Sequence, residues 1–96
     1  MTPWDELITT LDHLAAHDDE IPADVESTLV SLIDRAKEDR AIDRELRTPE
    51  TARWLIGLAL AQRELRRRDH AGTGDDDAAQ LRMITTRWLH PARPRA

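Results

Sequence analysis

The chain of 96 residues has no cysteine, phenylalanine or tyrosine, and it has only three glycines. The absence of cysteine excludes disulfides, thiol catalysis and zinc sites built on thiolate ligands. Three glycines leave almost no material for a loop that cradles phosphate. No apolar run approaches the ~18 residues that a membrane span needs. We therefore expect no transmembrane helix, and the acidic N-terminus, which lacks a basic-then-apolar leader, predicts a cytoplasmic location.

A chain of this length predicts a single domain, which we place at residues 1–90. Hydrophobic residues make up 40% of the chain, enough for a small core, and the net charge of -5 is too low for charge-driven disorder. Residues 91–96 contain two prolines and two arginines but no large apolar side chain. They are expected to form a mobile basic tail.

Charge is distributed unevenly along the chain. Residues 1–46 contain 13 acidic and 4 basic side chains, a net charge of -9, whereas residues 47–96 contain 6 acidic and 10 basic ones, a net charge of +4. Opposite charges attract, so the acidic half is expected to fold against the basic half of the same chain or of a second copy.

Four helix-start signals divide the sequence. Thr2-Pro3 and Thr48-Pro49 combine a hydroxyl cap with proline at the first helical position, Pro22 is a weaker version, and Asp75–Asp77 places carboxylates where a helix dipole is positive. We expect one long helix over residues 22–47, because its middle is rich in good helix formers. No segment alternates with period two. The sequence predicts an all-α, small four-helix bundle.

The third segment, about residues 49–69, predicts the central helix of this bundle. Residues 54–61 carry no charge and are apolar all round a helix, which is typical of a helix surrounded by protein. Beyond Gln62 the segment turns Arg-rich and is expected to leave the core. Trp4, Trp54 and Trp88 lie on three different helices and are expected to share one aromatic cluster; alternatively, Trp88 anchors a partner.

The sequence offers little for catalysis. His13 and His17 have the spacing of two metal ligands on one helix, with Glu6 and Thr10 on the same side. However, this side lies opposite the apolar stripe, so solvated histidines are expected rather than a metal site. The two serines have no nucleophile-elbow context. We expect no metal, no cofactor, no small-molecule substrate and no enzymatic activity.

Two alternatives rest on charge. A small nucleic-acid-binding regulator could use the Arg-rich end of the third helix, but the acidic balance and the apolar start of that helix oppose DNA binding. Its candidate phosphate contacts are Arg63, Arg66, Arg67 and Arg68. Alternatively, the acid-only first 33 residues could imitate phosphates and inhibit a basic protein.

The interpretation that fits best is a non-enzymatic helical protein acting through protein–protein contacts, of the adaptor, accessory or inhibitor type. The partner is another protein or a second copy, as in a homodimer. Whether the acidic helices or the Arg-rich half makes the contact stays open, and Ile42 and Leu46 could instead pack under the third helix. The candidate contact residues are Arg40, Ile42, Arg44, Leu46, Arg47 and Trp88.

Overall fold

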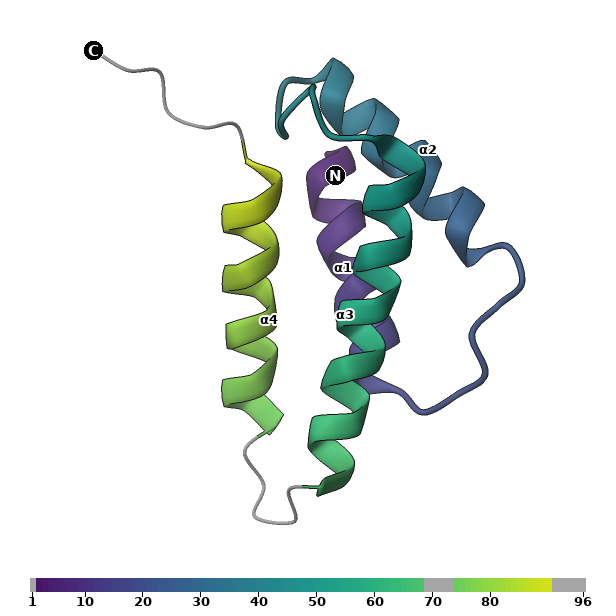
Figure 1. Ribbon diagram of the computed structural model, residues 1–96, viewed down its shortest axis with the longest axis vertical. Helices are drawn as coiled ribbons and strands as arrows, with labels where there is room; N and C mark the ends of the chain where they lie inside the picture. The colour runs from purple at the N-terminus through teal and green to yellow at the C-terminus, as the bar shows by residue number, and fades with distance from the viewer. Residues whose placement is uncertain (1, 69–73, 91–96) are drawn as a thin grey trace.

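The computed structural model describes residues 2–68 and 74–90, apart from the side chains of residues 74–76, and in these residues it contains helices and no strand. The helices are α1 (Pro3–Ala16), α2 (Val25–Glu38), α3 (Thr48–Arg68) and α4 (Gly74–Leu89), as Figure 1 shows. The predicted all-α four-helix bundle is confirmed. The predicted mobile tail, residues 91–96, lies outside the described residues.

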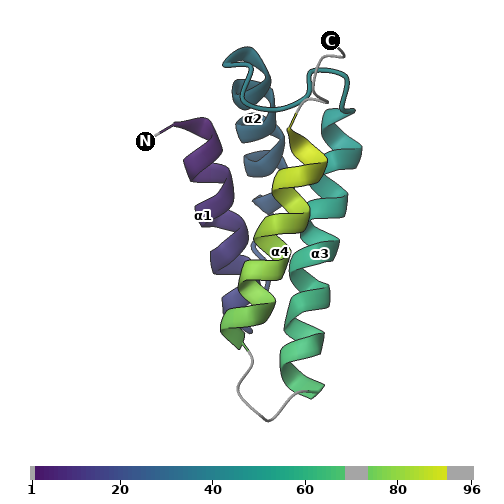
Figure 2. The ribbon, with the colours of Figure 1, turned by 90° about the vertical axis from the view of Figure 1, so that its left-hand side faces the viewer.

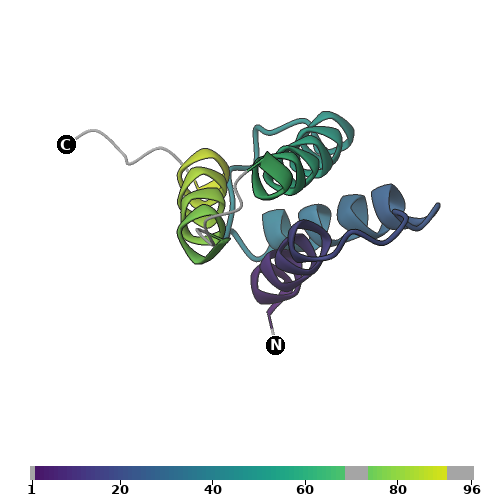
Figure 3. The ribbon, with the colours of Figure 1, turned by 90° about the horizontal axis from the view of Figure 1, so that it is seen from below.

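The bundle is built on the pair α1 and α3, each of which packs against all the other helices. Seen from below, α2 and α4 lie on opposite sides of this pair, and their described residues make no contact (Figure 3). α3 and α4 run antiparallel, side by side (Figure 2). Apolar side chains of all four helices fill the core, chiefly Leu7, Leu11, Leu29, Ile33, Leu55 and Leu89. None of the described helices is both long enough and apolar enough to cross a bilayer.

Two of the predicted helix starts are confirmed, the first of them together with its hydroxyl cap. The Thr2 hydroxyl accepts a hydrogen bond from the Asp5 backbone N–H at 3.1 Å, and the Asp5 carboxylate accepts one from the Thr2 N–H at 3.4 Å, which completes a capping box. α3 begins at Thr48, as predicted, and the Thr48 hydroxyl donates to Asp34 Oδ1 at 2.7 Å. This last bond ties the start of α3 to α2.

The predicted long helix over residues 22–47 is wrong, because α2 ends at Glu38. The stop is a Schellman motif, in which the Ala41 N–H donates to the Ala36 carbonyl at 2.9 Å and the Arg40 N–H donates to the Lys37 carbonyl at 3.0 Å. This motif needs a left-handed residue, and Arg40 takes that role with φ of 60°. Glycine is the usual residue at this position, and its absence from residues 39–47 leaves the end of α2 without a recognisable stop signal.

The loop of residues 39–47, which connects α2 to α3 along the chain, is hydrogen-bonded to the C-terminal end of α4. The Asp43 N–H donates to the Leu89 carbonyl at 2.6 Å, and His90 Nδ1 lies 2.8 Å from the Ala41 carbonyl oxygen. These bonds hold the last turn of α4 against the rest of the bundle.

The prediction that α3 is surrounded by protein is wrong, although α3 does contact every other helix. Leu55 and Ala59 are buried, but Trp54 is 66% exposed and Leu65 is 54% exposed. α1 and α2 cover one side of α3 and α4 covers a flank, so three neighbours leave a strip of α3 open to water.

Arg40→Gly should stabilise the protein by about 0.5–1 kcal/mol, because glycine adopts a positive φ without the steric cost that arginine bears. Urea unfolding followed by circular dichroism measures the change. Arg44→Gly is the matched control: it removes the same charge from the same loop, at an exposed residue whose φ is not positive. If the two variants lose stability equally, the left-handed stop is not where the structure places it.

Candidate functional site

Four large apolar side chains line an open depression of about 350 Å³ where α3 and α4 meet. Trp54 and Leu58 come from α3, and Ile84 and Trp88 come from α4. Three of them are exposed and Leu58 is half-buried. We call these four residues the apolar face. Single exposed apolar residues are ordinary on protein surfaces, but a contiguous group is typical of an interaction site.

The apolar face continues along α3. Trp54, Leu58, Ala61 and Leu65 are separated by four, three and four residues, so they lie along one side of the helix. This is the seven-residue repeat of helices that pair with other helices. The same spacing is visible in the sequence, but an octapeptide without charges (54–61) favours a buried helix just as well. The choice between the two depends on how many neighbours surround α3.

A second depression, of about 390 Å³, lies beside Trp54 on the flank of α3 that carries Glu50, Arg53 and Gly57. A side chain added at Gly57 would meet no described atom within 4 Å. Because Gly57 has no side chain, a gap remains between the Trp54 ring and the exposed side chains of Glu50 and Arg53.

The structure divides the predicted partner-contact residues. Ile42 is fully buried in the core and Leu46 is half-buried against it, so these two pack internally, which was the alternative interpretation. The loop arginines Arg40, Arg44 and Arg47 are exposed. Trp88 is the one candidate that lies on the apolar face.

The three tryptophans do not form one cluster, and that prediction is wrong. Trp4 packs against the core, with its ring 4.6 Å from the ring of His90 between centroids. Trp54 and Trp88 lie on the apolar face. Trp54 was missed as a candidate contact because it begins the octapeptide that was expected to be buried.

The prediction that the helix leaves the core beyond Gln62 is wrong for Arg63. It is only 7% exposed, and its guanidinium donates through Nε to the Leu14 carbonyl at 2.6 Å and through Nη1 to the Asp19 carbonyl at 2.9 Å. The last carbonyls of a helix have no partner within the helix and carry partial negative charge. Arg63 therefore supplies a donor to the Leu14 carbonyl at the end of α1 and to the Asp19 carbonyl of the loop that follows, and no pattern in the sequence indicates this role.

Arg66 completes the same arrangement. Its Nη1 donates to the Ala15 carbonyl, and its Nη2 lies 2.7 Å from Asp18 Oδ1. Arg67 and Arg68 are exposed and approach Glu64 at 3.8 and 3.1 Å. All four candidate phosphate contacts thus have partners within the chain, and two of them, Arg63 and Arg66, bind backbone carbonyls.

The acidic N-terminal half packs against the basic half of the same chain. Arg66 and Arg67 both pair with Asp18, and Arg82 of α4 pairs with Asp12 of α1. Intramolecular attraction, one of the two outcomes predicted from the uneven charge, is therefore realised. These pairs are largely exposed, so each contributes at most about 1 kcal/mol to stability.

His13 and His17 lie on the surface, with their rings stacked at 4.1 Å between centroids. His17 Nδ1 is 2.9 Å from the His13 carbonyl oxygen, so this ring caps the end of α1. Glu6 pairs with Arg35 at 3.4 Å rather than with either histidine. Among the described residues, no three His, Cys, Asp or Glu side chains gather as they would around a metal ion.

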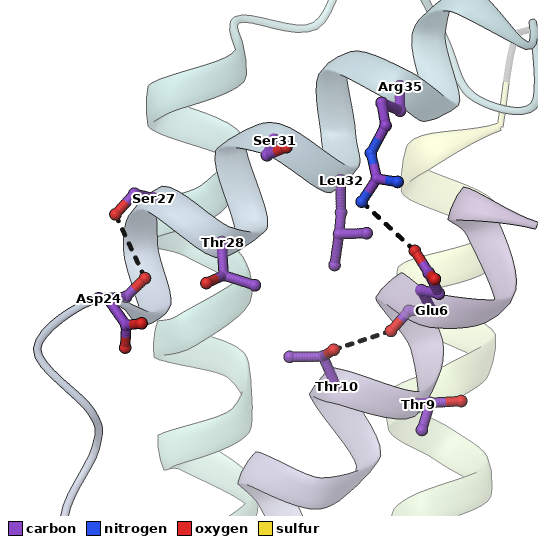
Figure 4. Close-up of a pocket in the computed structure, with 9 residues that line it drawn as sticks. All are labelled: Glu6, Thr9, Thr10, Asp24, Ser27, Thr28, Ser31, Leu32 and Arg35. Atoms are coloured by element: carbon purple, nitrogen blue, oxygen red, sulfur yellow. Dashed lines mark hydrogen bonds and ion pairs between the residues drawn. The ribbon is translucent and has the colours of Figure 1, made fainter.

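A hydroxyl-rich groove of about 590 Å³ runs between α1 and α2 (Figure 4). Two of its hydroxyls are already engaged: Thr10 donates to the Glu6 carbonyl at 2.8 Å, and Ser27 donates to the Asp24 carbonyl at 3.3 Å. None of the nine described residues that line the groove is aromatic. Leu32 is the one large apolar side chain among these nine residues, so the groove lacks the aromatic and aliphatic walls that hold most small ligands.

No protein-family model matches this chain, and no curated protein or solved structure matches it either. Small helical bundles serve many unrelated functions, so the fold alone does not select one. The function has to be argued from the surfaces described above, of which the apolar face has the most distinctive chemistry.

Arg63→Met should destabilise the protein by about 2–3 kcal/mol, because it leaves the Leu14 and Asp19 carbonyls without their charged donor. Methionine keeps most of the side-chain volume, so the loss reports the hydrogen bonds. Arg67→Met, at an exposed position of the same helix, should change stability by less than about 0.5 kcal/mol. Urea unfolding of both variants measures the difference, and equal stabilities would contradict the anchoring role of Arg63.

Proposed function

We propose that this chain is a non-enzymatic protein that acts through protein–protein contacts made by the apolar face. One observation carries the proposal: two tryptophans from different helices, Trp54 and Trp88, border one exposed apolar depression. Tryptophan is enriched among the residues that contribute most to binding energy, especially where it sits beside a pocket.

The surroundings of the apolar face support the same proposal. Trp54 is flanked by Glu50 and Arg53, and Arg87 lies next to Trp88 in the sequence, so charged groups border an apolar centre. An apolar centre with a polar rim is the usual composition of a protein interface. A small adaptor, accessory protein or inhibitor has this kind of surface.

The shape of the face indicates what it contacts. Its α3 side chains follow a seven-residue repeat, and the depression lies along the seam between two antiparallel helices. Such a seam fits an amphipathic helix whose anchors recur every three and four residues. We therefore propose a helical element as the contacting part of the partner.

A photo-crosslinking amino acid at position 61 tests the proposal inside cells of the native host. Ala61 is exposed and lies between Leu58 and Leu65 on the same side of α3, so a crosslinker there should capture whatever covers the apolar face. We expect one dominant protein adduct after irradiation. Mass spectrometry identifies the captured chain, which is either a second copy or another protein.

The matched control places the same crosslinker at Ser31, an exposed residue of α2 that faces the hydroxyl-rich groove. An adduct at position 61 that is absent at position 31 supports the proposal. It should also disappear when Trp54 and Trp88 are both changed to serine. Equal labelling at both positions, or no adduct at position 61, would overturn the proposed function.

A further inference from the structure

We propose that the apolar face is covered by a second copy of this chain, with the two α3 helices antiparallel across a two-fold axis. This inference rests on the proposed function, since it names the occupant of the same face. Two properties of α3 support it. The helix has a gap near one end and a protruding side chain near the other, and these come together in an antiparallel pair. Its charged side chains also meet opposite charges when a second copy of the helix runs in the reverse direction.

The apolar strip of α3, from Trp54 to Leu65, has a gap at one end and a protruding side chain at the other. At one end, the depression beside Trp54 is open because Gly57 has no side chain. At the other end, Leu65 projects from the helix and is 54% exposed. An antiparallel pair centred between Trp54 and Leu65 places each Leu65 opposite the other copy's Trp54 and next to its Gly57. Each copy then supplies one knob and one hole, as paired helices require.

The flank of α3 that faces away from α4 carries charged residues near both of its ends. Glu50 and Arg53 lie near its N-terminal end, and Glu64 and Arg68 lie near its C-terminal end. In the same antiparallel register, Arg53 comes level with the second copy's Glu64, and Glu50 comes level with its Arg68. Two-fold symmetry repeats each pairing, so four opposite-charge pairs border the interface.

A parallel pairing of α3 would lose both the fit of Leu65 beside Gly57 and the opposite-charge pairs. In a parallel pair, the charged flank of one α3 faces the opposite flank of the other α3, so Arg53 and Glu64 would lie against the α4 side of the second copy and lose their opposite-charge partners. The two Trp54 side chains would also meet at one end, while the small Ala61 side chains would leave a gap near the other. The sequence of α3 therefore favours the antiparallel dimer.

Gly57→Leu tests whether Leu65 of the second copy fills the gap beside Gly57. The added side chain points into open space in the monomer and improves helix propensity, so the melting temperature of the monomeric protein should stay the same or rise. In the dimer it occupies the place of the second copy's Leu65, and the dimer Kd should rise about tenfold or more. Sedimentation velocity over a concentration series measures Kd, and Ser31→Leu, which adds leucine on α2, should leave it unchanged.

Arg53→Glu and Glu64→Arg test whether Arg53 pairs with Glu64 of the second copy. Each single variant places like charges together at two sites of an antiparallel dimer, so each homodimer should weaken by about fivefold to tenfold. An equimolar mixture of the two single variants should form a heterodimer with the affinity of the unmodified chain, because every pairing becomes complementary. A parallel dimer would leave both single variants unchanged, and that result would overturn the antiparallel arrangement.

Failure of this inference can be distinguished from failure of the proposed function. If the chain stays monomeric up to about 1 mM while the crosslinker at position 61 captures a different protein, the second copy is excluded and the apolar face remains an interaction site. If self-association is seen but Gly57→Leu leaves Kd unchanged, the dimer uses another surface, and the inference is overturned.

Discussion

The one-sided burial of α3 determines the arrangement of the other helices and of the surface. Leu55 and Ala59 face α1 and α2, and packing of this side closes the main core. Burial of apolar area supplies the dominant favourable free energy, roughly 25 cal/mol per Å². With that side occupied and α4 on one flank, none of the described helices covers the strip through Trp54 and Leu65. The apolar face is therefore a consequence of how the core forms.

The same helix also solves an electrostatic problem at its other end. α1 ends with unpaired carbonyls beside the acidic segment Asp18–Glu20, where negative potential accumulates. Arg63 and Arg66 project from α3 to this point, because they lie about two and three turns beyond Leu55 on the buried side. Both guanidiniums donate hydrogen bonds to backbone carbonyls, so these two arginines of the Arg-rich end of α3 stabilise the fold and are not free to contact a ligand.

The sequence predicts the fold class and the helix starts well, because hydroxyl caps, prolines and apolar stripes act locally. It predicts the end of α2 badly, since Arg40 adopts the left-handed conformation without being glycine. The apolar face was missed for a different reason. An uncharged octapeptide is compatible with both burial and exposure, and the number of neighbours around α3 is a property of the whole bundle. Of the four residues of the apolar face, only Trp88 was predicted as a partner contact, because it lies near the end of the chain.

Gly57 connects the local chemistry of α3 with the surface around it. A glycine in the middle of a helix costs about 1 kcal/mol relative to alanine. Some helical glycines are explained by close packing, but a side chain at this position would meet no described atom within 4 Å, and the helix does not need a positive φ there. No described neighbour therefore benefits from the missing side chain. In the proposed dimer, the second copy's Leu65 fills the depression beside Trp54, and this contact would give the missing side chain of Gly57 a physical reason.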